Sequence, residues 1–134
     1  MRILLAATCL VAALGLACGG GESDSNEEKI ETVLRAYFQH YIDSEIEEIY
    51  PLLDAASRRD CSQDQFLEVM SSTRGAVGDL EIEFLEISEI VIEADQATVT
   101  SQLRFDEVTD STENTLIKEG SDWRIQIRPE ICQT

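Results

Sequence analysis

The feature that most constrains this chain is an apolar stripe at helical spacing between Ile30 and Ile42. Its members recur every three or four residues: Ile30, Val33, Leu34, Tyr37, Phe38, Tyr41 and Ile42. This spacing places them on one face of one helix, because an α-helix turns about once every 3.6 residues. Such a helix must bury its stripe against another layer, so the rest of the chain is expected to supply that layer.

Three pairs of residues fit the spacing of a capping box, in which a serine hydroxyl accepts an unpaired amide of the first turn. They are Ser25 with Glu28, Ser44 with Glu47, and Ser62 with Gln65. They predict one helix that ends near residue 43 and two shorter ones over 45–53 and 63–74. Pro51 is expected to bend the second helix, and Gly75 and Gly78 to end the third.

From residue 79 the apolar period changes to two, which predicts a series of antiparallel strands. A change of phase near Phe84 and Leu85 predicts a bulge in the first strand. Residues 94–96 and 119–122 are predicted turns, and the acidic stretch 106–114 is a predicted hairpin loop. The expected inner face has one polar residue, Ser101. Its other members are Leu80, Ile82, Phe84, Val99, Leu103, Phe105, Trp123, Ile125 and Ile127.

Residues 1–17 are typical of a secretory signal peptide, with Arg2 before an apolar run and small residues after it. The run is shorter than the roughly 20 residues that span a bilayer. The residues around Cys18 resemble a bacterial lipoprotein signal, in which the cysteine becomes the lipid-modified first residue. The resemblance implies a lipid anchor at Cys18 and a location in the bacterial cell envelope, outside the cytoplasm. The alternative is an ordinary signal peptide, which would leave a secreted protein.

Residues 18–25 combine glycine, serine and acids after the cysteine, which predicts a flexible linker. Residues 26–134 then form one domain. The chain has 27 acidic and 10 basic residues, for a net charge of −17. A surface with this charge repels phosphate groups, which argues against nucleic-acid binding and against docking on anionic lipid.

The cysteines that remain after export predict a disulfide. Cys9 leaves with the signal peptide and Cys18 takes the lipid, so Cys61 and Cys132 form an even pair. Two structural thiols and a redox pair are the alternatives, but the spacing is not that of a catalytic dithiol. The sequence has no Cys/His cluster at metal-ligand spacing, and the acids in 106–113 lack the glycine of a calcium loop. We therefore predict no metal and no cofactor.

The order of elements resembles the nuclear-transport-factor-2-like (NTF2-like) superfamily. The resemblance rests on a helix with Tyr37 and Tyr41, two further helices, and long strands that close on the hairpin Leu116-Ile117-Lys118-Glu119-Gly120-Ser121-Asp122-Trp123-Arg124-Ile125. It implies an α+β cone, with N-terminal helices packed on a curved antiparallel sheet. The chain resembles in particular the small secreted lipoproteins of that superfamily whose function is not known.

The resemblance also implies a pocket or an active site inside the cone. Enzymes of the superfamily use an Asp or His as general base, but His40 lies at the flank of the stripe and the pattern places no carboxylate on the inner face. We therefore predict a non-catalytic domain that binds a small apolar ligand or a protein partner. The alternatives are a small isomerase or dehydratase and a structural module that forms a homodimer. The candidate pocket residues are Tyr37, Tyr41, Phe84, Leu103, Phe105 and Trp123.

Overall fold

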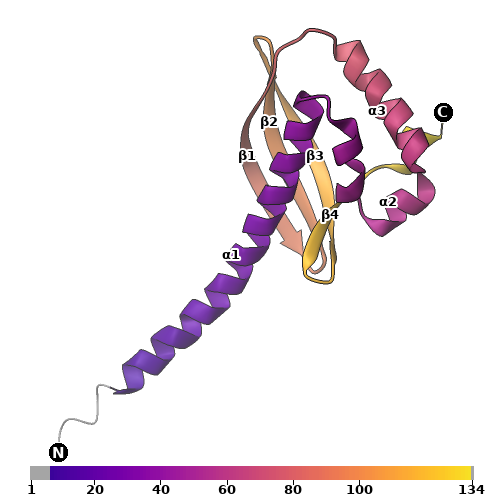
Figure 1. Cartoon of the computed structure of the whole chain (residues 1–134). Coiled ribbons are helices and arrows are strands. Elements are labelled where there is room, and N and C mark those ends of the chain that lie inside the picture. Colours follow the sequence, from indigo (N-terminus) through magenta and orange to yellow (C-terminus); the bar gives the residue numbers. More distant parts are fainter. Residues whose placement is uncertain (1–6, 134) are drawn as a thin grey trace, which may run out of the picture.

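The computed structural model describes residues 7–133, with side chains from Ser25 onward. The predicted signal peptide, the lipidation site at Cys18 and all of the predicted linker except Ser25 lie outside the residues whose side chains are described. These three assignments stay predictions. Figure 1 shows α1 in front of the sheet, with α2 and α3 beside it. The elements are α1 (Ala7–Ile42), the 3-10 helices η2 (Ile46–Glu48) and η3 (Tyr50–Leu52), α2 (Ala55–Asp60), α3 (Gln63–Val77), β1 (Ile82–Glu93), β2 (Gln96–Phe105), β3 (Val108–Glu119), β4 (Asp122–Gln126) and η4 (Pro129–Cys132).

The predicted α+β class is confirmed, with helices that precede an antiparallel sheet of order β1-β2-β3-β4. Each strand pairs with the next one along the chain, as short turns allow. The register of β1 against β2 shifts between Phe84 and Glu86, where a bulge was predicted, and again between Ile87 and Glu89. On the outer face, an ion pair between Arg104 and Glu83 joins β2 to β1.

The apolar stripe of α1 is buried as predicted. Ile30 and Leu34 are fully buried and Phe38 nearly so, against the inner face of the sheet, where Val99, Leu116 and Ile125 are buried too. Burial of each such side chain stabilises the fold by roughly 1.5 to 3 kcal/mol. None of the helices in the described part of the chain has the length and apolar character needed to cross a membrane.

The α-helix predicted over 45–53 was wrong, because the 3-10 helices η2 and η3 are present there instead. Ser44 has a φ of 61°, whereas an N-cap residue needs an extended backbone, so Ser44 caps nothing. Pro51 lies in the first turn of η3, where its missing amide is tolerated. The capping box expected at Ser25 is also absent, since Ser25 lies inside α1.

Two helices differ from the prediction: α2 was not expected, and α3 is longer than expected. Asp54 caps α2, since its side chain accepts a hydrogen bond from the Ser57 amide at 3.0 Å. An aspartate at this position is a recognised N-cap signal, so the sequence did indicate this helix. The capping box of Ser62 and Gln65 at the start of α3 is confirmed. The helix continues through Gly75 and ends at Gly78, which has the left-handed backbone (φ 66°) that favours glycine.

The loop predicted over 106–114 was also wrong. Asp106 and Glu107 alone turn the chain, and β3 pairs with β2 from Val108 onward. Polar residues in β3 hid the strand, although its threonines favour extended backbone. Leu80, expected on the inner face, precedes β1 and is 44% exposed.

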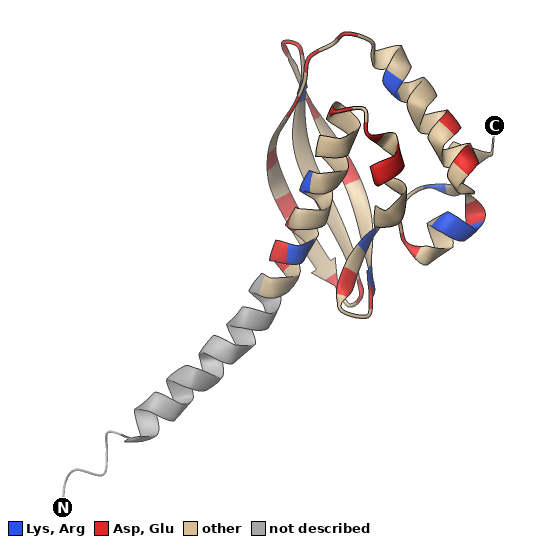
Figure 2. Cartoon of the chain, in the orientation of Figure 1, with Lys and Arg blue, Asp and Glu red and all other residues tan. Residues whose placement is uncertain are grey.

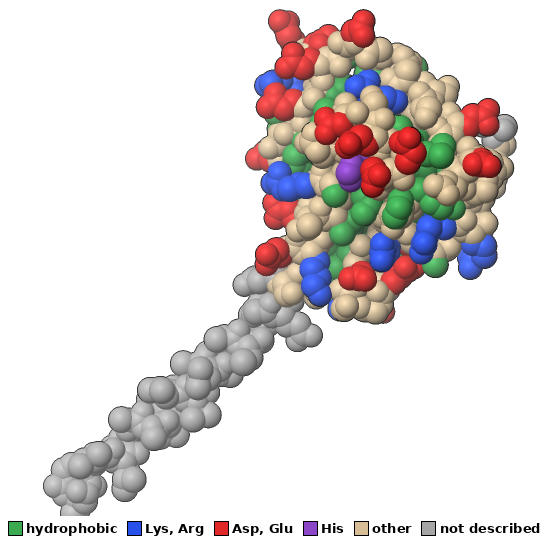
Figure 3. Space-filling model, in the orientation of Figure 1, with side chains coloured by type: hydrophobic (Ala, Val, Ile, Leu, Met, Phe, Trp, Pro, Cys, Tyr) green, Lys and Arg blue, Asp and Glu red, His purple; other side chains and the backbone are tan. Residues whose placement is uncertain are grey.

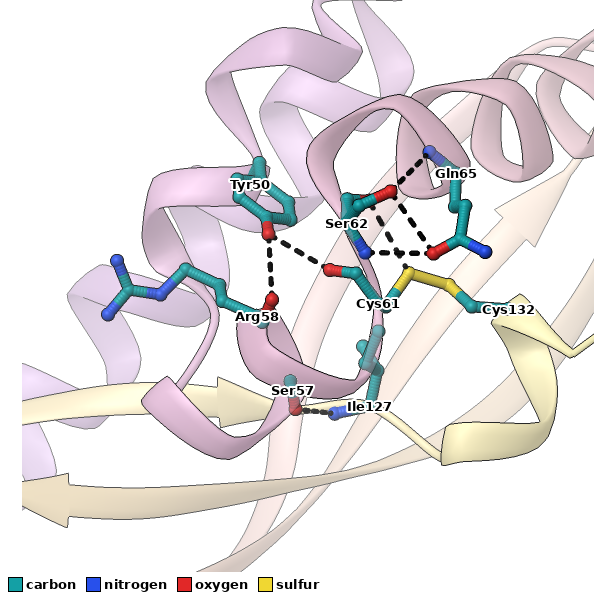
Figure 4. The surroundings of a disulfide bond; sticks show 8 residues. All are labelled: Tyr50, Ser57, Arg58, Cys61, Ser62, Gln65, Ile127 and Cys132. Atoms are coloured by element: carbon teal, nitrogen blue, oxygen red, sulfur yellow. Dashed lines mark hydrogen bonds between the residues drawn. A yellow bond between two sulfur atoms is a disulfide. The ribbon is translucent and has the colours of Figure 1, made fainter.

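The predicted disulfide between Cys61 and Cys132 joins the end of α2 to η4, with the two Cα atoms 5.6 Å apart (Figure 4). Tyr50 supports this junction, since its hydroxyl donates to the carbonyls of Arg58 and Cys61 at 3.1 and 2.9 Å. Ser57 accepts from the Ile127 amide at 3.0 Å and so ties α2 to the chain after β4. The C-terminal segment is therefore fixed beside α3.

Candidate functional site

A cleft of about 620 Å³ opens between α1, α3, the inner face of the sheet and η4. We call it the cone cleft. Its volume is in the range of small-molecule sites, roughly 300 to 1,000 Å³. The residues that line it are Tyr37, Phe38, Tyr41, Val69, Met70, Thr73, Ile82, Leu103, Phe105, Asp110, Ser111, Thr112, Glu130 and Ile131.

Local periodicity explains how these side chains meet. Tyr37 and Tyr41 are four residues apart on α1, so both point to the same side of that helix. Leu103 and Phe105 alternate along β2 on the inner face. Asp110 lies directly opposite Leu103 in the register of β2 with β3, which brings a carboxylate beside an apolar wall.

Four of the six candidate pocket residues line the cone cleft, namely Tyr37, Tyr41, Leu103 and Phe105. Phe84 does not: it stacks on Phe38 with ring centroids 5.4 Å apart, and the Arg35 guanidinium lies 5.0 Å from its ring centroid. The structure thus places the candidates at more than one site.

Trp123 also lies away from the cone cleft. It lines a separate cleft of about 490 Å³ with Lys29 and Leu52, and its indole N–H donates to Asn26 Oδ1 at 3.3 Å. The side chain is 2% exposed. Trp123 fluorescence therefore reports on that second cleft and not on the cone cleft.

The polar residues of the cone cleft were not predicted, because they lie on a strand that was expected to be a loop. Along β3 the inward positions opposite the inner row of β2 are Asp110, Thr112 and Asn114, so Ser101 is not the only polar residue of that face. The available signal was weak: Thr109, Thr112 and Thr115 favour extended backbone. Glu130 reaches the cleft on η4, for which no pattern existed.

Two buried polar atoms on this face have no hydrogen-bond partner among the described residues: Ser101 Oγ and Asn114 Oδ1. Ser101 is fully buried and lies opposite Thr112, which lines the cone cleft. Buried polar groups are nearly always hydrogen-bonded in folded proteins. Neither residue is in the lining of the cone cleft, so these two atoms lie behind its wall.

Tyr37 brings a protonated hydroxyl to the cleft. Burial raises the pKa of Tyr37 to about 12, and repulsion between its phenolate and that of Tyr41 adds to the rise. Burial also raises the pKa of Tyr41, while the Arg74 guanidinium opposes that rise. Both hydroxyls hence remain hydrogen-bond donors at neutral pH rather than bases.

The raised pKa of Tyr37 predicts a loss of stability in alkali. The unfolded chain loses this proton near pH 10, so between pH 10 and about 12 the folded state binds more protons and its stability falls as pH rises. We expect a decrease on the order of 2 kcal/mol across that window, measured by urea denaturation at several pH values. Tyr37→Phe should flatten the profile, and an unchanged slope in this variant would contradict the assignment.

The acidic residues are spread over the helices, strands and turns, with fewer basic residues between them (Figure 2). Figure 3 shows one face, where the single histidine lies among acidic side chains. His40 Nδ1 lies 3.1 Å from Glu45 Oε1, and neither residue lines the cone cleft. Among the residues that the structure describes, no group of three His, Cys, Asp or Glu side chains could hold a metal ion.

No family model matches the sequence, and no curated protein is similar to it in sequence. A crystal structure described as that of an NTF2-like transpeptidase from Campylobacter jejuni matches this chain with a TM-score of 0.57 at 15% identity, over 73% of this chain and 97% of the other. The fold is NTF2-like. An SEC-C motif-containing protein from Rhodopseudomonas palustris matches with a TM-score of 0.44 at 18% identity, over 71% of this chain and 73% of the other.

At this identity the likeness concerns the fold alone. The function is therefore argued from the side chains of the cone cleft.

Proposed function

We propose that the chain is a membrane-tethered, extracytoplasmic domain whose cone cleft binds a small, mainly apolar ligand without catalysing a reaction. The observation that carries the proposal is the wall of the cleft, which consists mainly of aromatic and aliphatic side chains from α1, α3 and β2, Tyr37 among them. A mainly apolar site with few polar groups is typical of ligand binding. The location outside the cytoplasm and the tether rest on the signal-like residues 1–17 and on Cys18.

The position of the acids favours binding over catalysis. Asp110 and Glu130 both line the cleft, but both are exposed to solvent. A general base acts best in a site from which water is excluded. Two solvent-exposed carboxylates do not meet that condition, so they suit recognition of a ligand better than removal of a proton.

A small isomerase or dehydratase is the second candidate. One observation favours it: Asp110 lines the same cleft as Tyr37 and Tyr41, which combines a carboxylate with hydroxyls that could polarise a carbonyl. Isomerase and dehydratase assays on simple carbonyl substrates test it. Turnover that Asp110→Asn abolishes would establish the enzyme, whereas blank assays are expected for a binding domain.

Filling the cone cleft is expected to weaken binding of an apolar probe. Thr73 lines the cleft on α3 and is exposed, so Thr73→Trp adds bulk at the site without opening the core. We expect N-phenyl-1-naphthylamine, whose fluorescence rises in apolar surroundings, to bind the native protein. The variant should bind it roughly tenfold more weakly or worse, which corresponds to about 1.4 kcal/mol of lost contact.

The matched control is Ser71→Trp, on the same helix and exposed, but not in the lining of the cleft. This variant should bind the probe as the native protein does. Equal binding by both tryptophan variants would place the probe elsewhere. Failure of the native protein to bind it or any related apolar compound would refute the binding domain.

A further inference from the structure

We propose that the ligand of the cone cleft is an organic amine that binds in its ammonium form, with an apolar body on the aromatic wall. The inference rests on the proposed binding function and adds the chemical class of the ligand. It depends on three observations: the sign of the charges in the lining, the hydrogen-bond acceptors beside them, and the charge of the whole chain.

Every charged side chain in the lining of the cone cleft is acidic. Asp110 comes from β3 and Glu130 from η4, and the lining contains no Lys, Arg or His. Neither carboxylate forms an ion pair with another residue in the described part of the chain. Two carboxylates on separate elements thus face one cleft without a cation to neutralise them, which favours a ligand with positive charge.

The polar groups beside the carboxylates can accept hydrogen bonds. Asp110 and Thr112 are two residues apart on the inward row of β3, and both line the cleft. Ser101 lies opposite Thr112, fully buried behind this wall, and its hydroxyl has no partner among the described residues. The Asp110 carboxylate and the Thr112 hydroxyl can both accept from an ammonium group, which offers three N–H donors.

The charge of the whole chain acts in the same direction. A net charge of −17 spread over the surface raises the local concentration of cations and repels anions (Figure 2).

Three compounds with one apolar body test the inference: 4-phenylbutylamine, 4-phenylbutanol and 4-phenylbutyrate. Each competes with N-phenyl-1-naphthylamine on the purified full-length protein at pH 7 and low salt. The amine should displace the probe at about a tenfold lower concentration than the alcohol, the effect expected of two exposed carboxylates, and the acid should be weakest. High salt should reduce the difference between amine and alcohol.

The variant Asp110→Asn with Glu130→Gln should lose the preference for the amine but keep the alcohol. The matched control is Glu107→Gln with Glu113→Gln, which removes the same charge from exposed residues outside the lining and should keep the preference. Equal displacement by amine and alcohol in the native protein would overturn the inference while the binding function stands. So would a control pair that loses the preference as well. Absence of probe binding altogether would refute the binding function itself.

Discussion

Replacement of both Cys61 and Cys132 by serine is expected to lower the free energy of unfolding by about 4 kcal/mol. The bridge joins two residues with a sequence separation of 71. Without the bridge, the unfolded chain between them gains conformational entropy, which favours the unfolded state. The two cysteines are 1% and 8% exposed, so their serine hydroxyls would also be placed in an apolar setting. Urea denaturation of the native protein and the double variant measures the difference.

The native protein in the presence of a reductant should behave as the double variant does. Thiol titration of the denatured, unreduced protein should detect neither Cys61 nor Cys132. The bridge also holds η4, which carries Glu130 and Ile131 to the cone cleft, so the variant should bind the apolar probe more weakly even under conditions where it is folded. A denaturation midpoint that reductant does not change would contradict this account.

Replacement of Cys18 by alanine is expected to move the protein from the membrane fraction to the soluble fraction. Each buried CH₂ of an acyl chain contributes about 0.8 kcal/mol to membrane binding, so loss of the lipid removes the whole anchor. Fractionation of cells that express the native protein and the variant measures the shift. Cys9→Ala is the matched control, because Cys9 lies in the predicted signal peptide and should have no effect.

Two outcomes would contradict the tether. The native protein could be soluble, which would indicate an ordinary signal peptide, or the variant could remain in the membrane fraction, which would indicate another means of attachment. Since the domain is strongly acidic, electrostatic attraction to anionic lipid does not provide that means.

The parts of the fold that the sequence predicted well are those with a clear period or turn. The stripe of α1, the alternation of β2 and the hairpin that closes at Trp123 were all read from spacing, and all three are present. The phase change at Phe84 likewise located a bulge. In each case local preference and tertiary packing favour the same structure.

The errors occurred where packing and local preference differ. β3 was taken for a loop because its first half is polar, yet pairing with β2 satisfies its backbone. This error hid Asp110 and Thr112, and with them the polar side of the cone cleft. Glu130 could not be predicted, since the disulfide and not a periodic pattern brings η4 to that position.

The two register shifts in β1 determine how copies of this chain can meet. β1 has β2 on one side and no strand on the other in the described sheet, and an open edge of that kind can recruit a strand from another molecule. Here the bulges interrupt the ladder, and Glu83, Glu86 and Glu89 place negative charge along it. Growth of a shared sheet through the β1 edge is therefore disfavoured. Copies crowded on one surface would not join their sheets along this strand.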